Sequence, residues 1–290
     1  MNKIAVIDIG SNSVRLMRIA DGNVLYKKLK TTRLGEGLAF SLLLKDEAIA
    51  RTVDAISAFV EQAKMDEVDG IYAYATAAVR SAKNGREFVD KVYSVCGVKV
   101  EIISGEEEAR IGILGALGKK DGAIIDIGGA STELIIQKQE KIVYEKSLNI
   151  GVVRIRDVCG REQEKVRELS KRMVKEYGLE KVDGEVYAIG GTATTLGAIS
   201  QGLFVYDPKL VTGAKITKEK VEKLSNELFA MPVEEIEKIP CVDKLRADVL
   251  AGGVEWLFVV MNELNIPEII VSDGDNLEGY AISRGLLNEK

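Results

Sequence analysis

Two stretches of the chain share one pattern of apolar and polar positions. Residues 4–9 and 123–127 are short apolar runs of the kind that form buried strands, and each reaches Asp-Ile-Gly and a small polar turn. A second run follows each turn, at 14–19 and 132–136, and Asp-Gly-Asn at 21–23 then indicates a hairpin in the first copy. The pattern predicts one hairpin unit that is used twice.

The two copies align residue by residue. Residues 5–16 read AVIDIGSNSVRL and residues 123–134 read AIIDIGGASTEL, so Asp8 corresponds to Asp126 at an offset of 118 residues. This period is too long for a solenoid. It indicates a duplicated domain and a cleft with pseudo-two-fold symmetry.

The rest of the chain alternates between helical and strand patterns. Ser104 with Glu107 forms a capping box that starts a helix. Helices are predicted at 45–65, 84–95, 192–200, 218–230, 244–264 and about 276–287, and strands at 71–75, 98–103, 186–189 and 267–272. The predicted class is therefore α/β, and the repeat places a domain boundary near residue 120.

Composition and charge exclude several classes of protein. The 290 residues are 46% hydrophobic and 29% charged, which is typical of a globular protein. No apolar run is long enough for a membrane span, and the N-terminus is too short and too acidic for a signal peptide. The net charge of −5, without a basic stripe, argues against a nucleic-acid partner.

The chain has no histidine and three scattered cysteines. The absence of histidine excludes Ser-His-Asp triads, Cys-His dyads and imidazole metal sites. A bound metal would need oxygen ligands, which favours Mg²⁺ or Mn²⁺. Cys96, Cys159 and Cys241 have no paired spacing and indicate reduced thiols in the cytoplasm.

Three glycine-rich turns follow predicted strands. Such turns let consecutive backbone N–H groups bind an anion, and the third also opens a helix, whose N-terminus favours phosphate. Each turn could be purely structural, but the matched pair with a third favours phosphate binding. The candidate phosphate-binding residues in these turns are Gly10, Ser11, Asn12 and Ser13; Gly128, Gly129, Ala130 and Ser131; and Gly191 and Thr192.

Four acidic residues are candidates for metal binding or catalysis. Asp8 and Asp126 end buried strands, where a carboxylate is costly unless it is paired or metal-bound, although each could simply cap its own turn. Glu133 lies on the strand that leaves the second turn. Glu106 and Glu107 suit a helix start, whereas Glu108 is a plausible general base for water.

Arginine forks suit phosphate oxygens, and two arginines lie near loop signals. These are Arg33, in RLGEG, and Arg80, in ATAAVR. A surface role is about as plausible for each.

Together these motifs resemble the exopolyphosphatase / guanosine pentaphosphate phosphatase (Ppx/GppA) family, in the actin–Hsp70–sugar-kinase fold group. The matching stretches occur in family order over nearly the whole chain. They are DIGSNSVRL (8–16), RLGEGL (33–38), ATAAVR (75–80), IISGEEEAR (102–110), DIGGASTEL (126–134), NIGVVR (149–154), AIGGTATTL (188–196), RADVLAGG (246–253) and VSDGDNLEGY (271–280).

The resemblance implies two actin-like (ribonuclease H-like) domains with mixed sheets flanked by helices, and an active site in the cleft between them. The domains would be residues 1–119, joined by a C-terminal helix at about 276–290, and residues 120–275. It also implies a Mg²⁺-dependent phosphoanhydride hydrolase. Homodimers occur in the family, but no sequence feature fixes an interface.

By motif match, the resemblance assigns roles to individual residues. Glu108 would activate water, with Glu133 also catalytic, and Arg80 would contact phosphate. Asp126 and Glu133 would hold metal, and Asp8 is the third expected metal ligand. Two departures from the family pattern are Ala130, in place of a third glycine, and Leu277, in place of a frequent arginine. The additional C-terminal helical region of longer relatives has no counterpart in this sequence.

The main hypothesis is an exopolyphosphatase that releases orthophosphate from inorganic polyphosphate. The nearest rival is a phosphohydrolase acting on guanosine pentaphosphate (pppGpp), which the sequence does not separate from it. Two hypotheses from different classes are an ATP-dependent small-molecule kinase, for which no sugar-site constellation is evident, and a non-catalytic phosphate or alarmone sensor. Chain-length preference, metal identity and oligomeric state are left open.

Overall fold

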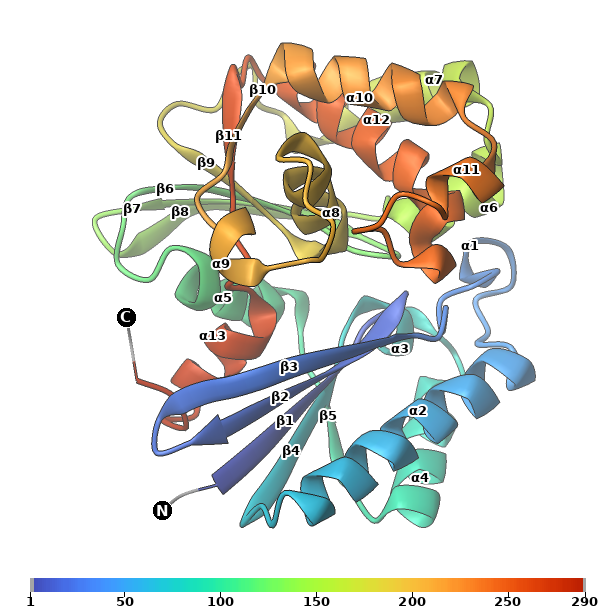
Figure 1. Ribbon diagram of the computed structural model, residues 1–290, viewed down its shortest axis with the longest axis vertical. Helices are drawn as coiled ribbons and strands as arrows, with labels where there is room; N and C mark the ends of the chain where they lie inside the picture. Colours follow the sequence, from blue (N-terminus) through green and yellow to red (C-terminus); the bar gives the residue numbers. More distant parts are fainter. Residues whose placement is uncertain (1–2, 289–290) are drawn as a thin grey trace. The chain divides into compact units, whose positions relative to one another are not determined.

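The computed structural model describes residues 3–288, which form two compact units. The first unit comprises the chain up to Gly115 together with the segment from Asn276 onward, and the second is Ala116–Asp275. Each unit is built on one mixed sheet flanked by helices, as expected from the sequence (Figure 1). The division falls a few residues before the boundary near 120 that the repeat indicates.

The first unit has a five-stranded sheet in the order β3-β2-β1-β4-β5. Strands β1, β2 and β3 form antiparallel pairs, whereas β4 and β5 continue the sheet in parallel. The bounds are β1 Lys3–Ile9, β2 Ser13–Ala20, β3 Asn23–Thr31, β4 Gly70–Ala75, β5 Val100–Ile102, α1 Leu38–Ser41, α2 Asp46–Met65, α3 Ala77–Ser81, α4 Gly85–Cys96, α5 Gly105–Ala116 and α13 Asn276–Ser283.

Both faces of this sheet are buried, because apolar side chains of β1 alternate between two clusters. Ala5, Ile7 and Ile9 pack with residues of α2 and α4, which lie together on one face (Figure 1). Ile4 and Val6 pack with residues of α5 and α13 on the other face. The C-terminal segment therefore completes the core of the first unit.

Helix α13 contacts α5 at very short range. A Cβ atom added at Gly279 would lie only 1.6 Å from the carbonyl oxygen of Ile111. Arg284, directly after α13, donates to Glu101 of β5 and to Glu107 of α5 at 2.8–2.9 Å. The backbone contact and the ion pairs together fix α5, the helix that carries Glu108.

The second unit has a six-stranded sheet in the order β10-β11-β9-β6-β7-β8. Its helices α6 and α7 were not predicted from the sequence. The bounds are β6 Gly122–Ile127, β7 Thr132–Lys138, β8 Lys141–Leu148, β9 Val186–Ile189, β10 Lys215–Thr217, β11 Glu268–Val271, α6 Val152–Cys159, α7 Gln163–Val174, η1 Lys175–Tyr177, α8 Gly190–Ser200, α9 Pro208–Val211, α10 Lys218–Ala230, α11 Val233–Ile236, η2 Lys244–Arg246 and α12 Ala247–Glu263.

The repeat in the sequence corresponds to the same three-stranded meander in each unit. Strands β1-β2-β3 and β6-β7-β8 have the same antiparallel order, with β4 or β9 parallel to the first strand. The ladder is irregular after Arg18 in one copy and after Ile136 in the other, which is the same place at the offset of the repeat. Shared irregularities of this kind support a duplication, since bulges are retained features rather than defects.

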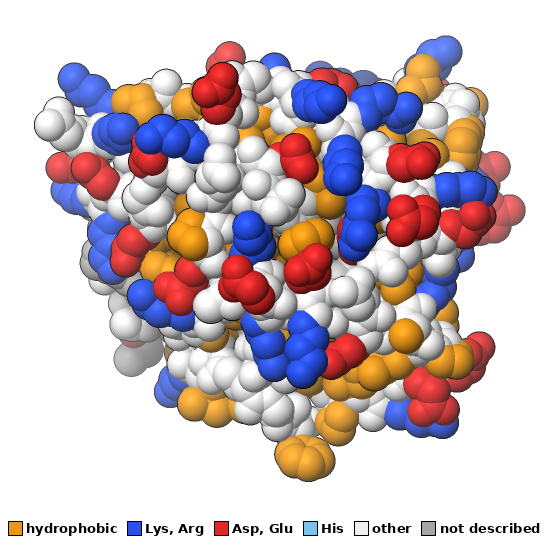
Figure 2. Space-filling model, turned by 90° about the horizontal axis from the view of Figure 1, so that it is seen from above, with side chains coloured by type: hydrophobic (Ala, Val, Ile, Leu, Met, Phe, Trp, Pro, Cys, Tyr) orange, Lys and Arg blue, Asp and Glu red, His pale blue; other side chains and the backbone are white. Residues whose placement is uncertain are grey.

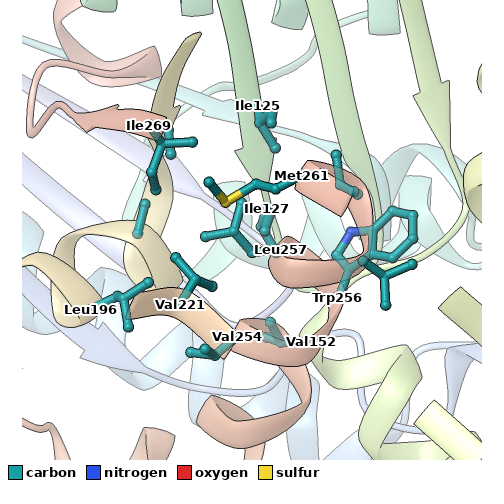
Figure 3. Packing of buried hydrophobic residues seen from close by; sticks show 14 of the residues in the cluster. Ile125, Ile127, Val152, Leu196, Val221, Val254, Trp256, Leu257, Met261 and Ile269 are labelled. Atoms are coloured by element: carbon teal, nitrogen blue, oxygen red, sulfur yellow. The ribbon is translucent and has the colours of Figure 1, made fainter. Parts of the chain in front are cut away.

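Helix α12 forms the centre of the hydrophobic core of the second unit. Met261 and Leu257 of α12 lie beside Ile127 of β6, with Ile125 next to them (Figure 3). Trp256 is fully buried in the same cluster, and its indole Nε1 donates to Thr132 Oγ1 at 2.9 Å. This contact joins the core directly to the strand that follows the second glycine-rich turn.

Charged side chains of both signs are interspersed over the face shown in Figure 2. That face has no continuous basic stripe of the kind that nucleic-acid binding requires. Within residues 3–288, no helix combines the length and apolar character needed to cross a lipid bilayer.

A fully buried carboxylate links three helices of the second unit. Glu255 of α12 is 0% exposed, and it accepts hydrogen bonds from Arg167 at 2.6 Å, Gln163 at 3.1 Å and Ser225 at 2.7 Å. Burying an ion is costly unless all of its acceptor sites are satisfied, and removing one partner of such a group leaves the others desolvated.

We expect Glu255→Ala to lower the free energy of unfolding by about 3 kcal/mol, since it leaves three donors without their acceptor. Urea unfolding followed by Trp256 fluorescence reports on this unit, because Trp256 is the only tryptophan in the chain. Glu227→Ala, at an exposed carboxylate of α10, is the control and should change stability by less than about 0.5 kcal/mol. Equal stability of the two variants would contradict the prediction.

Candidate active site

The two predicted phosphate-binding turns have the same backbone structure. Gly10 N donates to Ser13 O at 3.0 Å, and Gly128 N donates to Ser131 O at 3.0 Å. A Cβ atom at either glycine would lie 3.1–3.2 Å from the accepting carbonyl oxygen. Each Asp-Ile-Gly sequence therefore closes the same tight turn at the end of a buried strand.

The first turn is held from behind by residues 32–35. Asn12 O accepts from Thr32 N at 2.9 Å and Arg33 N at 2.8 Å, and Ser11 O accepts from Gly35 N at 2.8 Å. In a planar trans peptide the N–H group points opposite to the carbonyl oxygen. The N–H groups of Asn12 and Ser13 consequently point away from this support, as an anion-binding nest requires.

The second turn is held in the same manner by the start of α6. Gly128 O accepts from Val152 N at 3.0 Å, and Gly129 O accepts from Val153 N at 2.9 Å. The two segments are so close that a Cβ atom at Gly151 would lie 2.6 Å from Gly129. The N–H groups of Gly129 and Ala130 therefore point away from α6. Ala130 is not among the residues with positive φ, so alanine fits at this position.

The strand-end carboxylates have opposite surroundings in the two copies. Asp8 is paired across the sheet with Arg15, whose Nε and Nη2 both donate to Asp8 Oδ2. Asp126 is instead paired across the sheet with Glu133. Directly opposite side chains lie on one face of a sheet, where opposite charges attract and like charges repel. The first hairpin thus supplies its own cation, and the second brings two carboxylates together.

Glu133 is buried and oriented by its neighbours. Ser147, opposite Glu133 on β8, donates from Oγ to Glu133 Oε1 at 2.7 Å. Tyr177 lies nearby, donates to Thr132 O at 3.2 Å, and has a pKa well above its usual value because it is buried and close to the Glu133 charge. These contacts give the Glu133 carboxylate a defined position.

The third glycine-rich turn forms the N-terminus of α8 and lies against Asp126. Gly190 has φ of +83°, and a Cβ atom there would be 2.9 Å from Asp126 Oδ1. At the next residue, Gly191, a Cβ atom would be 1.5 Å from Arg246 Nη1. Glycine is required at both positions, because a carboxylate and a guanidinium occupy the adjacent space. Thr192, also in this first turn of α8, is buried.

The candidate base Glu108 lies on α5, whose start forms only the Ser104 half of the predicted capping box, because the Glu107 carboxylate accepts from Arg284 instead. Glu107 N donates to Ser104 Oγ at 3.1 Å. Glu108 is 6% exposed and accepts from Arg80 Nη1 at 2.8 Å, while Arg80 also donates to Ile103 O at 3.1 Å. Burial raises the pKa of the Glu108 carboxyl above 4.5, although Arg80 opposes this shift.

The predicted residues thus form two groups, one in each unit. Asp8 also raises the pKa of Glu108, which places both carboxylates near Arg80 and the first glycine-rich turn in the first unit. The second unit contains the other group, which consists of Asp126, Glu133 and the second and third turns.

Among residues 3–288, no three acidic or cysteine side chains lie close enough together to form a metal site. Leu277, at the departure from the family arginine, is fully buried in the α5–α13 cluster.

Sequence reasoning missed three side chains that contact this set. Arg15 is at the position of Glu133 in the aligned copies, so comparing the copies would have revealed it. Arg246 begins the RADVLAGG stretch but gave no sign of its contact with Gly191. Ser147 carries no motif, and only the strand register identifies it as the partner of Glu133.

Comparison with known proteins agrees with these features. The sequence model of the Ppx/GppA phosphatase family matches residues 12–287. Exopolyphosphatase 2 of Mycobacterium tuberculosis is 28% identical, over 98% of both chains. A guanosine-5'-triphosphate,3'-diphosphate pyrophosphatase of Photobacterium profundum is 31% identical, over 95% of this chain and 58% of that one.

Another relative is longer than this chain, and a solved structure shares the fold. The chain spans 47% of a bifunctional 3-dehydroquinate synthase/phosphatase of Fusobacterium nucleatum, at 30% identity over 98% of its own length. The crystal structure of the Aquifex aeolicus member of the Ppx/GppA family superposes with a TM-score of 0.78, at 30% identity and 98% coverage of both chains. This similarity confirms the predicted actin-like, two-domain fold class.

We expect Glu108→Gln to raise the unfolding midpoint at neutral pH. Because burial raises the folded-state pKa of Glu108, the folded protein binds this proton more tightly than the unfolded chain does. Stability is therefore lost as pH rises from 4.5 through the raised pKa, and a neutral glutamine avoids that loss. Thermal unfolding across this range should show a difference that is largest above the raised pKa and shrinks toward pH 4.5. Glu106→Gln, at the exposed acid of the same turn, should show no such trend; a parallel trend in both variants would contradict this account.

Proposed function

Because this chain belongs to the Ppx/GppA phosphatase family, we propose that it is an exopolyphosphatase that hydrolyses the terminal phosphoanhydride bond of inorganic polyphosphate. The observation that carries the proposal is the buried Glu108 carboxylate, which has a raised pKa and lies beside Arg80 in the unit with the first glycine-rich turn. A second support is the likeness to exopolyphosphatase 2, which extends over 98% of both chains.

The chemistry follows from the surroundings of Glu108. A carboxylate whose pKa is raised above its usual value is a stronger base for water than an exposed one. Arg80 keeps this carboxylate oriented, and the Arg80 side chain is still 28% exposed, so it is available to phosphate oxygens. Glu108 would accept a proton from the attacking water, while the N–H groups of Asn12 and Ser13 bind phosphate oxygens.

A divalent cation fits the second unit better than the first. Asp126 and Glu133 are directly opposite on β6 and β7, and a cation would relieve their mutual repulsion. Their oxygen donors suit Mg²⁺ or Mn²⁺. Asp8 already has Arg15 as its cation, which argues against a role as a direct metal ligand. When bound, the metal would supply charge neutralisation for the phosphate chain.

The proposal assigns the base to the first unit and the metal ligands to the second. The second candidate substrate is pppGpp, which is favoured by the 31% identity to the guanosine-5'-triphosphate,3'-diphosphate pyrophosphatase. The chemistry is the same for both substrates.

We place the reaction in the cytoplasm, since all three cysteines are free thiols.

Purified protein with Mg²⁺ should release inorganic phosphate from polyphosphate faster than from pppGpp or ATP. Glu108→Gln should lower kcat by about 10²–10⁴-fold, because it removes the base, and should leave substrate binding intact. Glu106→Gln is the matched control and should retain wild-type turnover. Preferential turnover of pppGpp would select the second candidate, and near-wild-type turnover by Glu108→Gln would refute the role of Glu108.

The metal assignment is tested without turnover by Mn²⁺ binding, measured by electron paramagnetic resonance. Glu133→Gln should weaken Mn²⁺ binding by about tenfold or more, since it removes a charged oxygen ligand. Asp8→Asn should bind Mn²⁺ as the wild type does, because the Asp8 carboxylate is already bound by the Arg15 guanidinium. Weakened binding in Asp8→Asn alone would reverse the assignment.

A further inference from the structure

Arg154 is a half-buried arginine without a partner that satisfies it. Its Nε atom is closed off from solvent and has no hydrogen-bond acceptor among residues 3–288. Desolvation lowers the pKa of the guanidinium, and the opposing influence is the charge of Asp157, one turn further along α6. An arginine in this state costs free energy that the folded chain does not recover.

Four other partly buried arginines have at least one acceptor, although Nη1 of Arg161, like Nε of Arg154, has none among residues 3–288. Arg80 donates to Glu108, Arg167 to Glu255, Arg161 to two main-chain carbonyl groups, and Arg156 pairs with Asp248 at 3.4 Å. Arg156 is the most informative comparison, because it lies on the same helix as Arg154 and has a carboxylate partner. The ion pair of Arg156 with Asp248 shows that an unsatisfied guanidinium is not a general property of arginines on α6.

This position is directly on the second glycine-rich turn. Arg154 N lies 3.4 Å from Gly129 O, on the carbonyl side of the turn where Val152 and Val153 make shorter bonds. An anion bound by the N–H groups lies on the opposite side, so it is the long side chain of Arg154 that would have to extend to it. Arg154 is also in the first turn of α6, where the helix dipole disfavours a cation. The charge of Asp157 on the same helix offsets the desolvation of Arg154 only in part, since the pKa of the guanidinium is still lowered, whereas an anion bound at the adjacent turn would favour the positive side chain.

We propose that Arg154 is a substrate-binding residue that contacts a phosphate group of the chain held by the second glycine-rich turn. The inference rests on the proposed function, since it takes a phosphate chain as the ligand. The guanidinium provides several donors in a fixed fork that matches phosphate oxygens. Because Nε is closed off from solvent, the Nη groups of the guanidinium would donate to the phosphate oxygens.

The test measures binding separately from hydrolysis. A methylene-bridged tripolyphosphate analogue is titrated calorimetrically, with Mg²⁺, into the wild type, Arg154→Gln, Arg154→Lys and Arg156→Gln. Arg154→Gln should bind about tenfold more weakly or worse, as expected for the loss of a charge-assisted hydrogen bond. Arg154→Lys should be intermediate, because it keeps the charge without the fork, and Arg156→Gln should bind as the wild type does.

Thermal unfolding of the free proteins separates a binding role from a structural one. Arg154→Gln should be as stable as the wild type or more stable, since it removes a desolvated cation. Unchanged affinity in Arg154→Gln would overturn the proposal, and so would a marked loss of stability, which would assign Arg154 to the fold. If the wild type binds the analogue through Arg154 but releases phosphate from no substrate, this inference stands and the proposed hydrolysis fails. If the wild type does not bind the analogue, both fail.

Discussion

The cost of a carboxylate at the end of a buried strand is the constraint on which the candidate residues of both units depend. The duplicated hairpin places Asp8 and Asp126 at this position in the two units. A charge there must be neutralised by a neighbouring group, by a bound ion or by protonation. Which of these applies determines what each copy can bind.

The two copies meet this constraint in different ways. In the first, Arg15 provides a permanent cation, and the hairpin is electrostatically complete within the protein. In the second, Glu133 replaces that arginine, and the hairpin gains a second acid in the same place. One substitution within a duplicated unit therefore gives an arginine–carboxylate pair in one copy and two acids side by side in the other.

The local features were predictable from the sequence, because they depend on neighbouring residues. The hairpins follow from period-two patterning, and the helix predicted at 84–95 is found as Gly85–Cys96, with Gly97 in the left-handed conformation at its end. The predicted start of the helix at residue 244 was less accurate, because Asp243 caps a short 3₁₀ turn before α12 begins at Ala247. The pattern of apolar residues is the same for a 3₁₀ turn as for a first α-helical turn, so the sequence did not distinguish the two.

The long-range pairs were not predictable. Arg80 and Glu108 are 28 residues apart and meet only because β4 and β5 are adjacent in the sheet. Arg246 reaches Gly191 through the packing of α12 on α8, which no local pattern records. Arg15 was predictable in principle, because the alignment of the two copies places it at the position of Glu133.

The place of α13 in the chain also governs the order in which the protein can fold during synthesis. One face of the first sheet is covered by residues such as Leu277 and Tyr280, which leave the ribosome after the entire second unit. The first unit must therefore wait, with apolar surface exposed, until its last helix arrives. A nascent chain of this design needs protection from aggregation until α13 has been synthesised.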